Sequence, residues 1–315
     1  MYLPAPVKYC GRMRILFPLM VLLSATGAAG ASFELPPSEF DLVGTVRVVE
    51  AWPEDTLLDV ARRYDIGQEA IVRANPDVDR WLPGGGTEVT IPSRHILPAT
   101  EREGLVLNLP EMRLYYYPQP EAGQPGVVQT YPVSIGRMDW ATPLGATSLI
   151  AKQEYPAWYP PESIRREHAA QGDPLPRVVP PGPDNPLGRY ALRLGIPGYL
   201  IHSTNKAFGV GMRVSHGCIR MLPEDIYQLF PQLPVGTVVT IINQPAKVGW
   251  YGGKLYLEVH PPLEEDEAGW ATLRETVLAK LDEALFRRPV QVDDEAIERA
   301  IQRKSGMPVA ISLGP

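Results

Sequence analysis

The chain has 315 residues, which is enough for about two domains of about 150 residues each. Charged residues make up 21% and hydrophobic residues 44%, an ordinary balance that excludes a wholly disordered chain. Proline is frequent, at 35 residues, and favours strands and structured loops over helical bundles or solenoids. The net charge of −6 argues against a nucleic-acid partner, because such proteins normally carry a basic surplus.

The start of the chain has the order of an export signal. A positively charged segment is followed by an apolar run and then by small residues: Lys8, Arg12 and Arg14; residues 15–23; and the A-x-A site Ala29-Gly30-Ala31. This order predicts a cleaved signal peptide over residues 1–31 and a periplasmic mature protein with no stable membrane span. An uncleaved anchor is the alternative, but the strongly apolar part is far shorter than the ~20 residues that a span needs.

Cleavage changes the cysteine count. The chain has two cysteines, Cys10 and Cys218, and Cys10 leaves with the signal. The mature protein then holds a single thiol in an oxidising compartment and cannot form an internal disulfide. Such a thiol pairs with another chain, is buried and inert, or is kept for its reactivity.

Residues 44–97 are predicted to form a small first module with the order strand, helix, helix, strand. This segment resembles a LysM module in three stretches: Trp52-Pro53-Glu54-Asp55-Thr56-Leu57; Ile71-Val72-Arg73-Ala74-Asn75-Pro76; and Leu82-Pro83-Gly84 with Val89-Thr90-Ile91-Pro92. The family often has Gly where Glu54 stands. The resemblance implies binding to a glycan that contains N-acetylglucosamine, here peptidoglycan, and the alternative is a spacer that binds no sugar.

Residues 101–245 are predicted to form a larger, mainly β domain. Its short strand candidates are separated by turns that contain Pro and Gly, a pattern typical of a β sandwich or barrel: residues 105–109, 113–117, 127–134, 146–151, 191–194, 200–202 and 238–242. Residues 155–197 contain ten prolines, and their aromatic start favours a packed lid with one short helix.

After residue 262 the composition changes. An acidic run over residues 264–267 precedes apolar residues at helical spacing, Pro289 ends that helix, and residues 293–304 form another. These features predict a helical C-terminal appendage over residues 262–305. The acidic run is interpreted as a helix N-terminus rather than a binding site.

Chemically reactive side chains gather in two stretches of the β domain. The first is His202-Ser203, at the end of a predicted strand, and the second is Ser215-His216-Gly217-Cys218-Ile219-Arg220. A thiolate is the reactive form of cysteine, and a nearby imidazole can take its proton. Amide groups around Gly217 and Cys218 could stabilise an oxyanion, and Arg220 could hold a substrate carboxylate.

Two plainer interpretations compete with a nucleophilic cysteine. A lone cysteine and a lone histidine are often simple packing residues. His202, His216 and Cys218 are also competent zinc ligands, although the chain has no paired C-x-x-C motif.

The same stretches resemble the signature of the L,D-transpeptidase (YkuD) catalytic domain. The resemblance extends to Asn185-Pro186-Leu187-Gly188 and Thr142-Pro143-Leu144-Gly145 and covers about 145 residues. The family often has Asn where Arg220 stands, and the spacing from His202 to Ser215 is at the short end. The resemblance implies that Cys218 is the nucleophile and His202 the proton donor and acceptor. It also implies that Ser203 orients the base through its backbone, that His216 and Gly217 shape the oxyanion site, and that Arg220 contacts substrate.

The implied reaction is acyl transfer without a metal or organic cofactor. Cys218 would attack the diaminopimelate carbonyl of a peptidoglycan tetrapeptide stem and release D-Ala. An amine then resolves the thioester, either a second diaminopimelate or the lysine of an outer-membrane lipoprotein. Domain order resembles envelope enzymes of the lipoprotein-anchoring and cross-linking group. A cell-wall peptide hydrolase on the same fold and a non-catalytic peptidoglycan-binding protein are the rival hypotheses.

Overall fold

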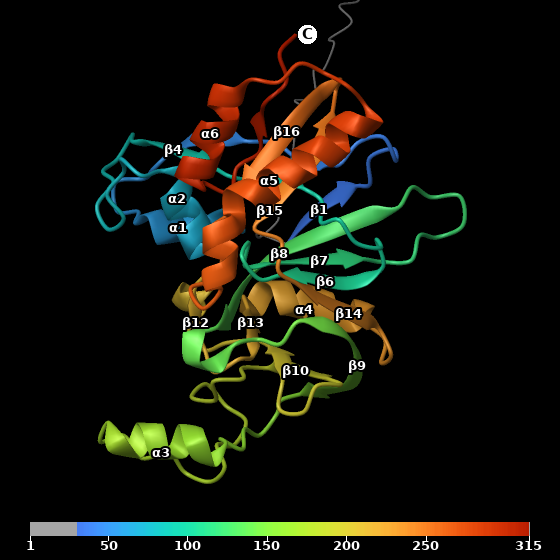
Figure 1. Ribbon diagram of the computed structural model, residues 1–315. Coiled ribbons are helices and arrows are strands. Elements are labelled where there is room, and N and C mark those ends of the chain that lie inside the picture. Colours follow the sequence, from blue (N-terminus) through green and yellow to red (C-terminus); the bar gives the residue numbers. More distant parts are fainter. Residues whose placement is uncertain (1–29, 315) are drawn as a thin grey trace, which may run out of the picture.

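The computed structural model describes residues 30–314 (Figure 1). The signal peptide expected over residues 1–31 therefore lies outside the described residues, except for its last two positions. Among the helices of the described part, none combines the length and the hydropathy that crossing a membrane requires.

The first module has the strand, helix, helix, strand order that the sequence predicts, with one further short strand at each end. Its elements are β2 (Leu42–Gly44), β3 (Arg47–Glu50), α1 (Leu57–Arg63), α2 (Gln68–Ala74), β4 (Glu88–Ile91) and β5 (Arg94–Ile96). Strand β3 pairs with β4 and β2 pairs with β5, both antiparallel. Helix α1 begins after Thr56, because the side chains of Thr56 and Asp59 form a reciprocal capping box. Leu57, Ile71 and Val89 fill the core between the helices and the β3–β4 pair.

A ten-stranded sheet forms the centre of the molecule. Its strands are β1 (Ala31–Glu34), β6 (Gly104–Asn108), β7 (Arg113–Tyr117), β8 (Val127–Gly136), β9 (Gly145–Glu154), β10 (Tyr190–Leu194), β11 (Leu200–His202), β12 (Arg213–Ser215), β13 (Ile219–Met221) and β14 (Val238–Ile242). The order along the sheet is β1-β8-β13-β11-β10-β9-β14-β6-β7, with β12 beside β8. A further pairing of β7 with β8 closes the circuit, so the predicted mainly β, barrel-like domain is confirmed.

The barrel core is aliphatic, and helix α4 (Pro223–Gln232) contributes to it. Leu107, Leu192 and Ile219 from the strands pack in one cluster with Ile226 and Leu229 from α4. Helix α4 directly follows β13, so the strand that continues from Cys218 is anchored in the core at its far end. Strand β1 was not expected from the sequence, and it pairs residues 31–34 with the edge of β8.

The C-terminal part contains the expected helices, but it is not purely helical. Helices α5 (Glu267–Arg287) and α6 (Asp294–Arg303) pack against a three-stranded sheet of β15 (Ala246–Tyr251), β16 (Lys254–Val259) and β17 (Val309–Ala310). Leu257, Val277 and Ile297 belong to their shared core. The prediction missed this sheet because the β15–β16 hairpin lies between the two expected domain boundaries. Its Gly252-Gly253 turn, with both glycines at positive φ, is a hairpin signal in the sequence.

Candidate active site

Two neighbouring strands bring the predicted catalytic residues onto one face of the sheet. Strands β11 and β13 are parallel, and Ile201 pairs with Ile219 and His202 with Arg220. Side chains alternate between the two faces of a strand, so His202, Arg220 and Cys218 project to the same side. His202 thereby becomes a neighbour in space of Cys218 and Arg220, which follow it by sixteen and eighteen residues in the sequence.

The loop before β13 depends on a glycine and on two hydroxyl groups. Gly217 has a φ of +93°, and a Cβ there would lie 2.9 Å from the Tyr199 ring. The Ser215 hydroxyl donates to the Cys218 carbonyl oxygen (2.5 Å), and the Thr142 hydroxyl donates to the Gly217 carbonyl oxygen (3.0 Å). The Thr-Pro-Leu-Gly stretch that begins at Thr142 thus supports the loop that carries the thiol.

His202 is placed to accept a proton. The residue is 3% exposed, and its Nδ1 lies 2.5 Å from the Ser203 carbonyl oxygen, to which a neutral ring donates. Burial and the neighbouring Arg220 charge lower the pKa of His202 to about 4, against the opposing effect of backbone hydrogen bonds. At neutral pH the imidazole is therefore uncharged, and with its proton on Nδ1 the Nε2 atom is an acceptor.

The Cys218 thiol is partly buried and protonated at rest. Burial raises the pKa of Cys218, while a backbone hydrogen bond and the Arg220 charge oppose that rise. In the described chain the thiol donates weakly to the Gly198 carbonyl oxygen (3.7 Å) rather than to the His202 ring. A neutral thiol beside a neutral imidazole needs the imidazole to remove its proton before attack.

Arg220 presents an unused donor. Its Nε atom is buried and has no hydrogen-bond partner among the described residues. Because five N–H groups on a planar guanidinium suit a carboxylate, the site can bind an anionic group beside Cys218.

His216 contacts the lid rather than the thiol. Its Nε2 lies 3.0 Å from Glu167 Oε2, and its ring packs edge-on to Trp140 with centroids 5.3 Å apart. Glu167 belongs to α3 (Glu162–Ala170) and also accepts from Arg137 at 2.6 Å. The sequence analysis missed Glu167, because nothing local links it to residues 49 positions away.

A cleft of about 1000 Å³ lies over this face of the sheet. The segment between β9 and β10 includes α3, which projects at one end of the molecule (Figure 1). Trp158, Tyr159 and Ile164 of this segment line the cleft. Asn185 fastens this segment, because its side-chain amide donates to the carbonyl oxygens of Pro156 (2.8 Å) and Pro180 (3.1 Å). The predicted lid is therefore packed and hydrogen-bonded, and its wall toward the cleft is largely apolar.

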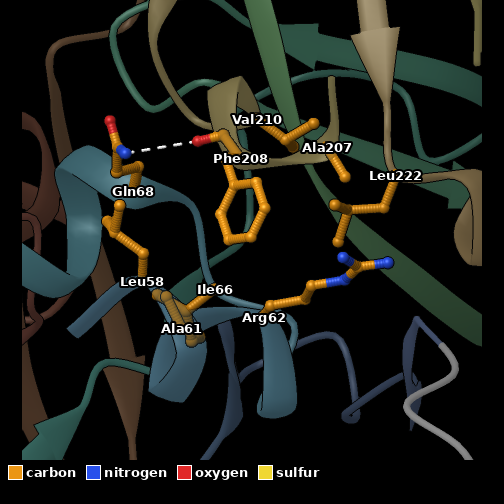
Figure 2. Close-up of a pocket in the computed structure, with 9 residues that line it drawn as sticks. All are labelled: Leu58, Ala61, Arg62, Ile66, Gln68, Ala207, Phe208, Val210 and Leu222. Atoms are coloured by element: carbon orange, nitrogen blue, oxygen red, sulfur yellow. Dashed lines mark hydrogen bonds between the residues drawn. The ribbon is translucent and has the colours of Figure 1, made fainter. Parts of the chain in front are cut away.

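The first module contacts the chain between His202 and Cys218 (Figure 2). The backbone N–H groups of Gln68 and Glu69 donate to the carbonyl oxygens of Val210 and Gly211 (both 3.1 Å), and the Gln68 amide donates to the Phe208 carbonyl (3.2 Å). These are the first residues of α2, where helix N–H groups lack partners within the helix. The module thereby holds the connection between β11 and β13.

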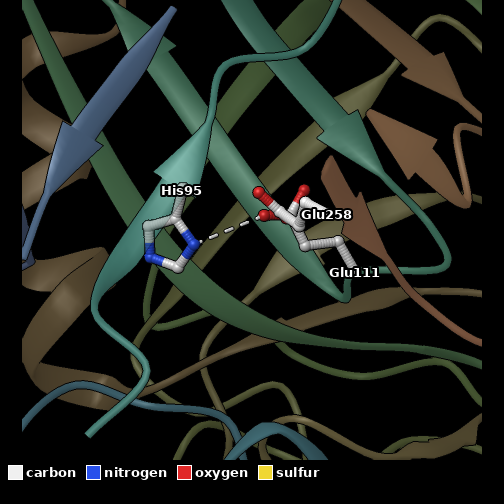
Figure 3. A group of neighbouring side chains, drawn as sticks. All are labelled: His95, Glu111 and Glu258. Atoms are coloured by element: carbon white, nitrogen blue, oxygen red, sulfur yellow. Dashed lines mark ion pairs between the residues drawn. The ribbon is translucent and has the colours of Figure 1, made fainter. Parts of the chain in front are cut away.

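A second cluster of titratable groups is formed by three residues that do not line the cleft: His95, Glu111 and Glu258 (Figure 3). His95, Glu111 and Glu258 are buried and close enough to share a metal ion. The Lys247 ammonium already occupies the space between the two carboxylates, at 3.0 Å from Glu111 and 2.8 Å from Glu258. It also donates to the Ile96 carbonyl oxygen (2.6 Å), so this cluster ties β5, β15 and β16 together.

The described residues form a mainly β, barrel-like domain with a candidate site on one face and a C-terminal extension. Residues 102–241 match the model of the L,D-transpeptidase catalytic domain (YkuD), and residues 251–311 match that of the L,D-transpeptidase C-terminal domain. The chain belongs to the L,D-transpeptidase family and is a transferase.

Two curated relatives are similar over nearly their whole length. The probable L,D-transpeptidase ErfK/SrfK of Escherichia coli K12 is 41% identical over 308 residues, which cover 96% of this chain and 98% of that protein. The probable L,D-transpeptidase YbiS of the same strain is 40% identical over 291 residues, which cover 90% and 93%. The crystal structure of L,D-transpeptidase 3 from Mycobacterium tuberculosis covers 51% of this chain and 67% of its own at 19% identity, with a TM-score of 0.32.

Proposed function

We propose that this transferase uses Cys218 to take the diaminopimelate acyl group of a peptidoglycan tetrapeptide stem and passes it to an amine in the periplasm. The observation that carries the proposal is the pairing of β11 with β13. A neutral imidazole, a thiol and a guanidinium line one cleft there, and the guanidinium Nε has no hydrogen-bond partner among the described residues. Those three groups are what acyl transfer from a peptide with a free carboxylate requires.

The chemistry follows from the protonation states. His202 Nε2 takes the Cys218 proton as the sulfur attacks the carbonyl carbon. Backbone N–H groups of the loop over Gly217 and Cys218 stabilise the oxyanion. Collapse of the tetrahedral intermediate breaks the bond to D-Ala, and the His202 imidazolium returns the proton to the departing amine. The acceptor amine then loses a proton to His202 and displaces the sulfur.

Arg220 separates two hollows that suit the two substrates. Besides the main cleft, it lines a hollow of about 770 Å³ together with Arg62, Lys206 and Phe208. We assign the donor stem to the cleft below the lid and the acceptor to this second, cationic hollow. There are two candidate acceptors, a diaminopimelate residue and the C-terminal lysine of a lipoprotein, and each carries a carboxylate. The guanidinium and ammonium groups that line the second hollow would attract that carboxylate.

The first module is proposed to bind glycan as a LysM-like unit. Two tryptophans on it, Trp52 and Trp81, are 63% and 59% exposed. Exposed aromatic rings offer flat apolar surfaces against which a sugar ring can pack. In this arrangement the glycan strand would be held while its stem peptide reaches the cleft.

The masses of the reaction products test the proposal and distinguish lipoprotein attachment, cross-linking and hydrolysis. The purified mature protein is incubated with a disaccharide-tetrapeptide, with and without a peptide that ends in lysine. A joined product that needs the lysine peptide establishes lipoprotein attachment, and a stem dimer without it establishes cross-linking. A bare tripeptide establishes the hydrolase instead. Cys218→Ala is the control, and full turnover by that variant would remove Cys218 from the mechanism.

A further inference from the structure

Two buried carboxylates lie side by side at the contact between the first module and the barrel. Asp65 sits in the turn between α1 and α2 with a φ of +56°, and Asp225 lies in the first turn of α4. Their exposed fractions are 5% and 0%. Among the described residues, none of their four carboxylate oxygens has a hydrogen-bond partner of good geometry. Buried carboxylates without partners are rare and require an explanation.

The charges around the pair do not balance. Arg113 is the buried cation that lowers the pKa of both carboxyls, and its guanidinium donates to the Thr130 hydroxyl (3.1 Å). Glu224 adds a further negative charge nearby, although it is paired with Arg62 at 3.0 Å. Burial raises the pKa of Asp65 and Asp225, and repulsion between them raises that of Asp225 further. The pair therefore either shares a proton or is completed by a second cation.

The start of the described chain passes directly beside this pair. Ala31 is the first residue of β1 and pairs with Thr130, the residue that Arg113 contacts. Its backbone N–H lies near enough to Asp65 to lower the pKa of that carboxyl. The preceding Gly30 lies against Tyr131, since a Cβ on Gly30 would be 2.0 Å from the Tyr131 ring.

We propose that processing leaves Ala31 as the first residue and that its α-ammonium binds between Asp65 and Asp225. The inference depends on the export proposed above, with cleavage after Gly30 instead of after Ala31. Ala28 and Gly30 are small residues at the required spacing before that bond. Hydrolysis consumes one water and leaves a carboxylate on Gly30 and, after protonation at neutral pH, an ammonium on Ala31. Two carboxylates, one guanidinium and one ammonium then form a neutral buried cluster.

The proposal makes the N-terminus a structural ligand. A peptide bond at Ala31 supplies one uncharged N–H, whereas a free terminus supplies three donors and a positive charge in the same place. The docked terminus would join β1, the first module and α4, the helix that follows the strand of Arg220. The unprocessed chain cannot make this link, so signal removal would complete the fold.

The first test is the intact mass of the protein purified from the periplasm after export of the full-length chain. A mass that begins at Ala31 is expected, and one that begins at Ser32 or later, or that retains the signal, overturns the proposal. Selective 13C-methylation of the α-amine, followed by an NMR titration, should then give a pKa above the ordinary value of about 7.7–8.0. An ordinary value would also overturn it.

The second test is a double-mutant cycle on thermal stability. A chain that begins at Ala31 is compared with one extended by Gly-Ser, each in the unchanged background and in the Asp225→Asn background. The extension should lower Tm by at least about 5 °C in the unchanged background and by much less in the Asp225→Asn background, where one partner of the ammonium has lost its charge. Asp77→Asn, at an exposed carboxylate of the same module, is the control. Equal effects of the extension in all backgrounds would refute the pairing, and none of these readouts depends on transpeptidase activity.

Discussion

The proposed role of His202 as a proton acceptor depends on its surroundings and not on the residue type alone. Burial keeps the ring neutral, and its Nδ1 lies 2.5 Å from the Ser203 carbonyl oxygen, which accepts the Nδ1 proton. Because Arg220 also lowers the pKa of His202, the base stays competent well into the acid range. The same guanidinium opposes the rise in the Cys218 pKa, so one residue influences the pKa of both side chains.

These protonation states predict the pH dependence. The His202 pKa of about 4 means that kcat/KM should fall only as the pH drops through that value and should be flat from about pH 5 to 8. His202→Ala should lower kcat/KM by about 10²–10⁴-fold at pH 7, and less at high pH where thiolate forms unaided. Initial rates with a soluble tetrapeptide across this range give the measurement. A defect of equal size at every pH would indicate a structural role for His202.

Glu167 connects the lid to the loop of the nucleophile through His216 and Arg137. Because these two partners lower the pKa of Glu167, the carboxylate is ionised and the contact intact at neutral pH. We predict that Glu167→Ala raises KM for the tetrapeptide several-fold and speeds alkylation of Cys218 by iodoacetamide. Glu162→Ala is the control, since that side chain lies on the same helix and is 72% exposed. If both variants behave alike, the Glu167 contacts do not hold the lid.

At the scale of elements, the contact of α2 with residues 208–211 links the module to the site. Gly211 has a φ of +87°, and a Cβ there would lie 2.3 Å from the backbone of Gly67 and Gln68. Gly211→Ala should therefore displace the chain between His202 and Cys218 and lower turnover of a soluble tetrapeptide by about 10-fold. Gly123→Ala, at a φ of +80° with nothing within 4 Å, controls for backbone strain alone. Equal turnover in the two variants would mean that the module serves only in binding.

Much of the candidate site could be predicted from the sequence, whereas some of the structure that supports it could not. Residues 215–220 and His202 were identifiable because the chemistry lies in a short run beside a strand end. The stretch that begins at Thr142 was also part of the resemblance, although not its hydrogen bond to Gly217. Glu167 was not identifiable, because it reaches His216 from a distant segment. Strand β1 was also missed, since a four-residue strand becomes recognisable only when its partner β8 is known.

At the scale of the whole molecule, a buried ionic cluster ties the three parts together. Lys247 from β15 bonds Glu111 beside the barrel strands, Glu258 from β16 and the backbone of β5 in the first module. Glu258 in turn accepts from the backbone N–H of Ile96 (2.6 Å) and from His260 (2.7 Å). The three parts are therefore joined by a buried ionic cluster whose central ammonium and carboxylates are paired.

Loss of the Lys247 ammonium should lower the stability of the whole protein. Lys247→Met leaves two buried carboxylates without their ammonium and should destabilise the protein by about 3–5 kcal/mol. Chemical denaturation followed by circular dichroism gives the value, and Lys254→Met on the neighbouring strand is the control. An unchanged midpoint would mean that the carboxylates find other partners or take up protons at no measurable cost.

The two walls of the cleft come from different parts of the chain, and this has a consequence for how such enzymes diversify. His202 lies in β11 and Cys218 directly precedes the adjacent strand β13 of a closed sheet, whereas much of the opposite wall comes from the one segment between β9 and β10. Residues of that segment can change without moving the thiol or the imidazole, as long as Asn185 and Glu167 keep their contacts. Substrate preference can therefore drift while the reaction itself stays constant. A family built this way can supply one cell with several enzymes that share a chemistry and differ in what they join.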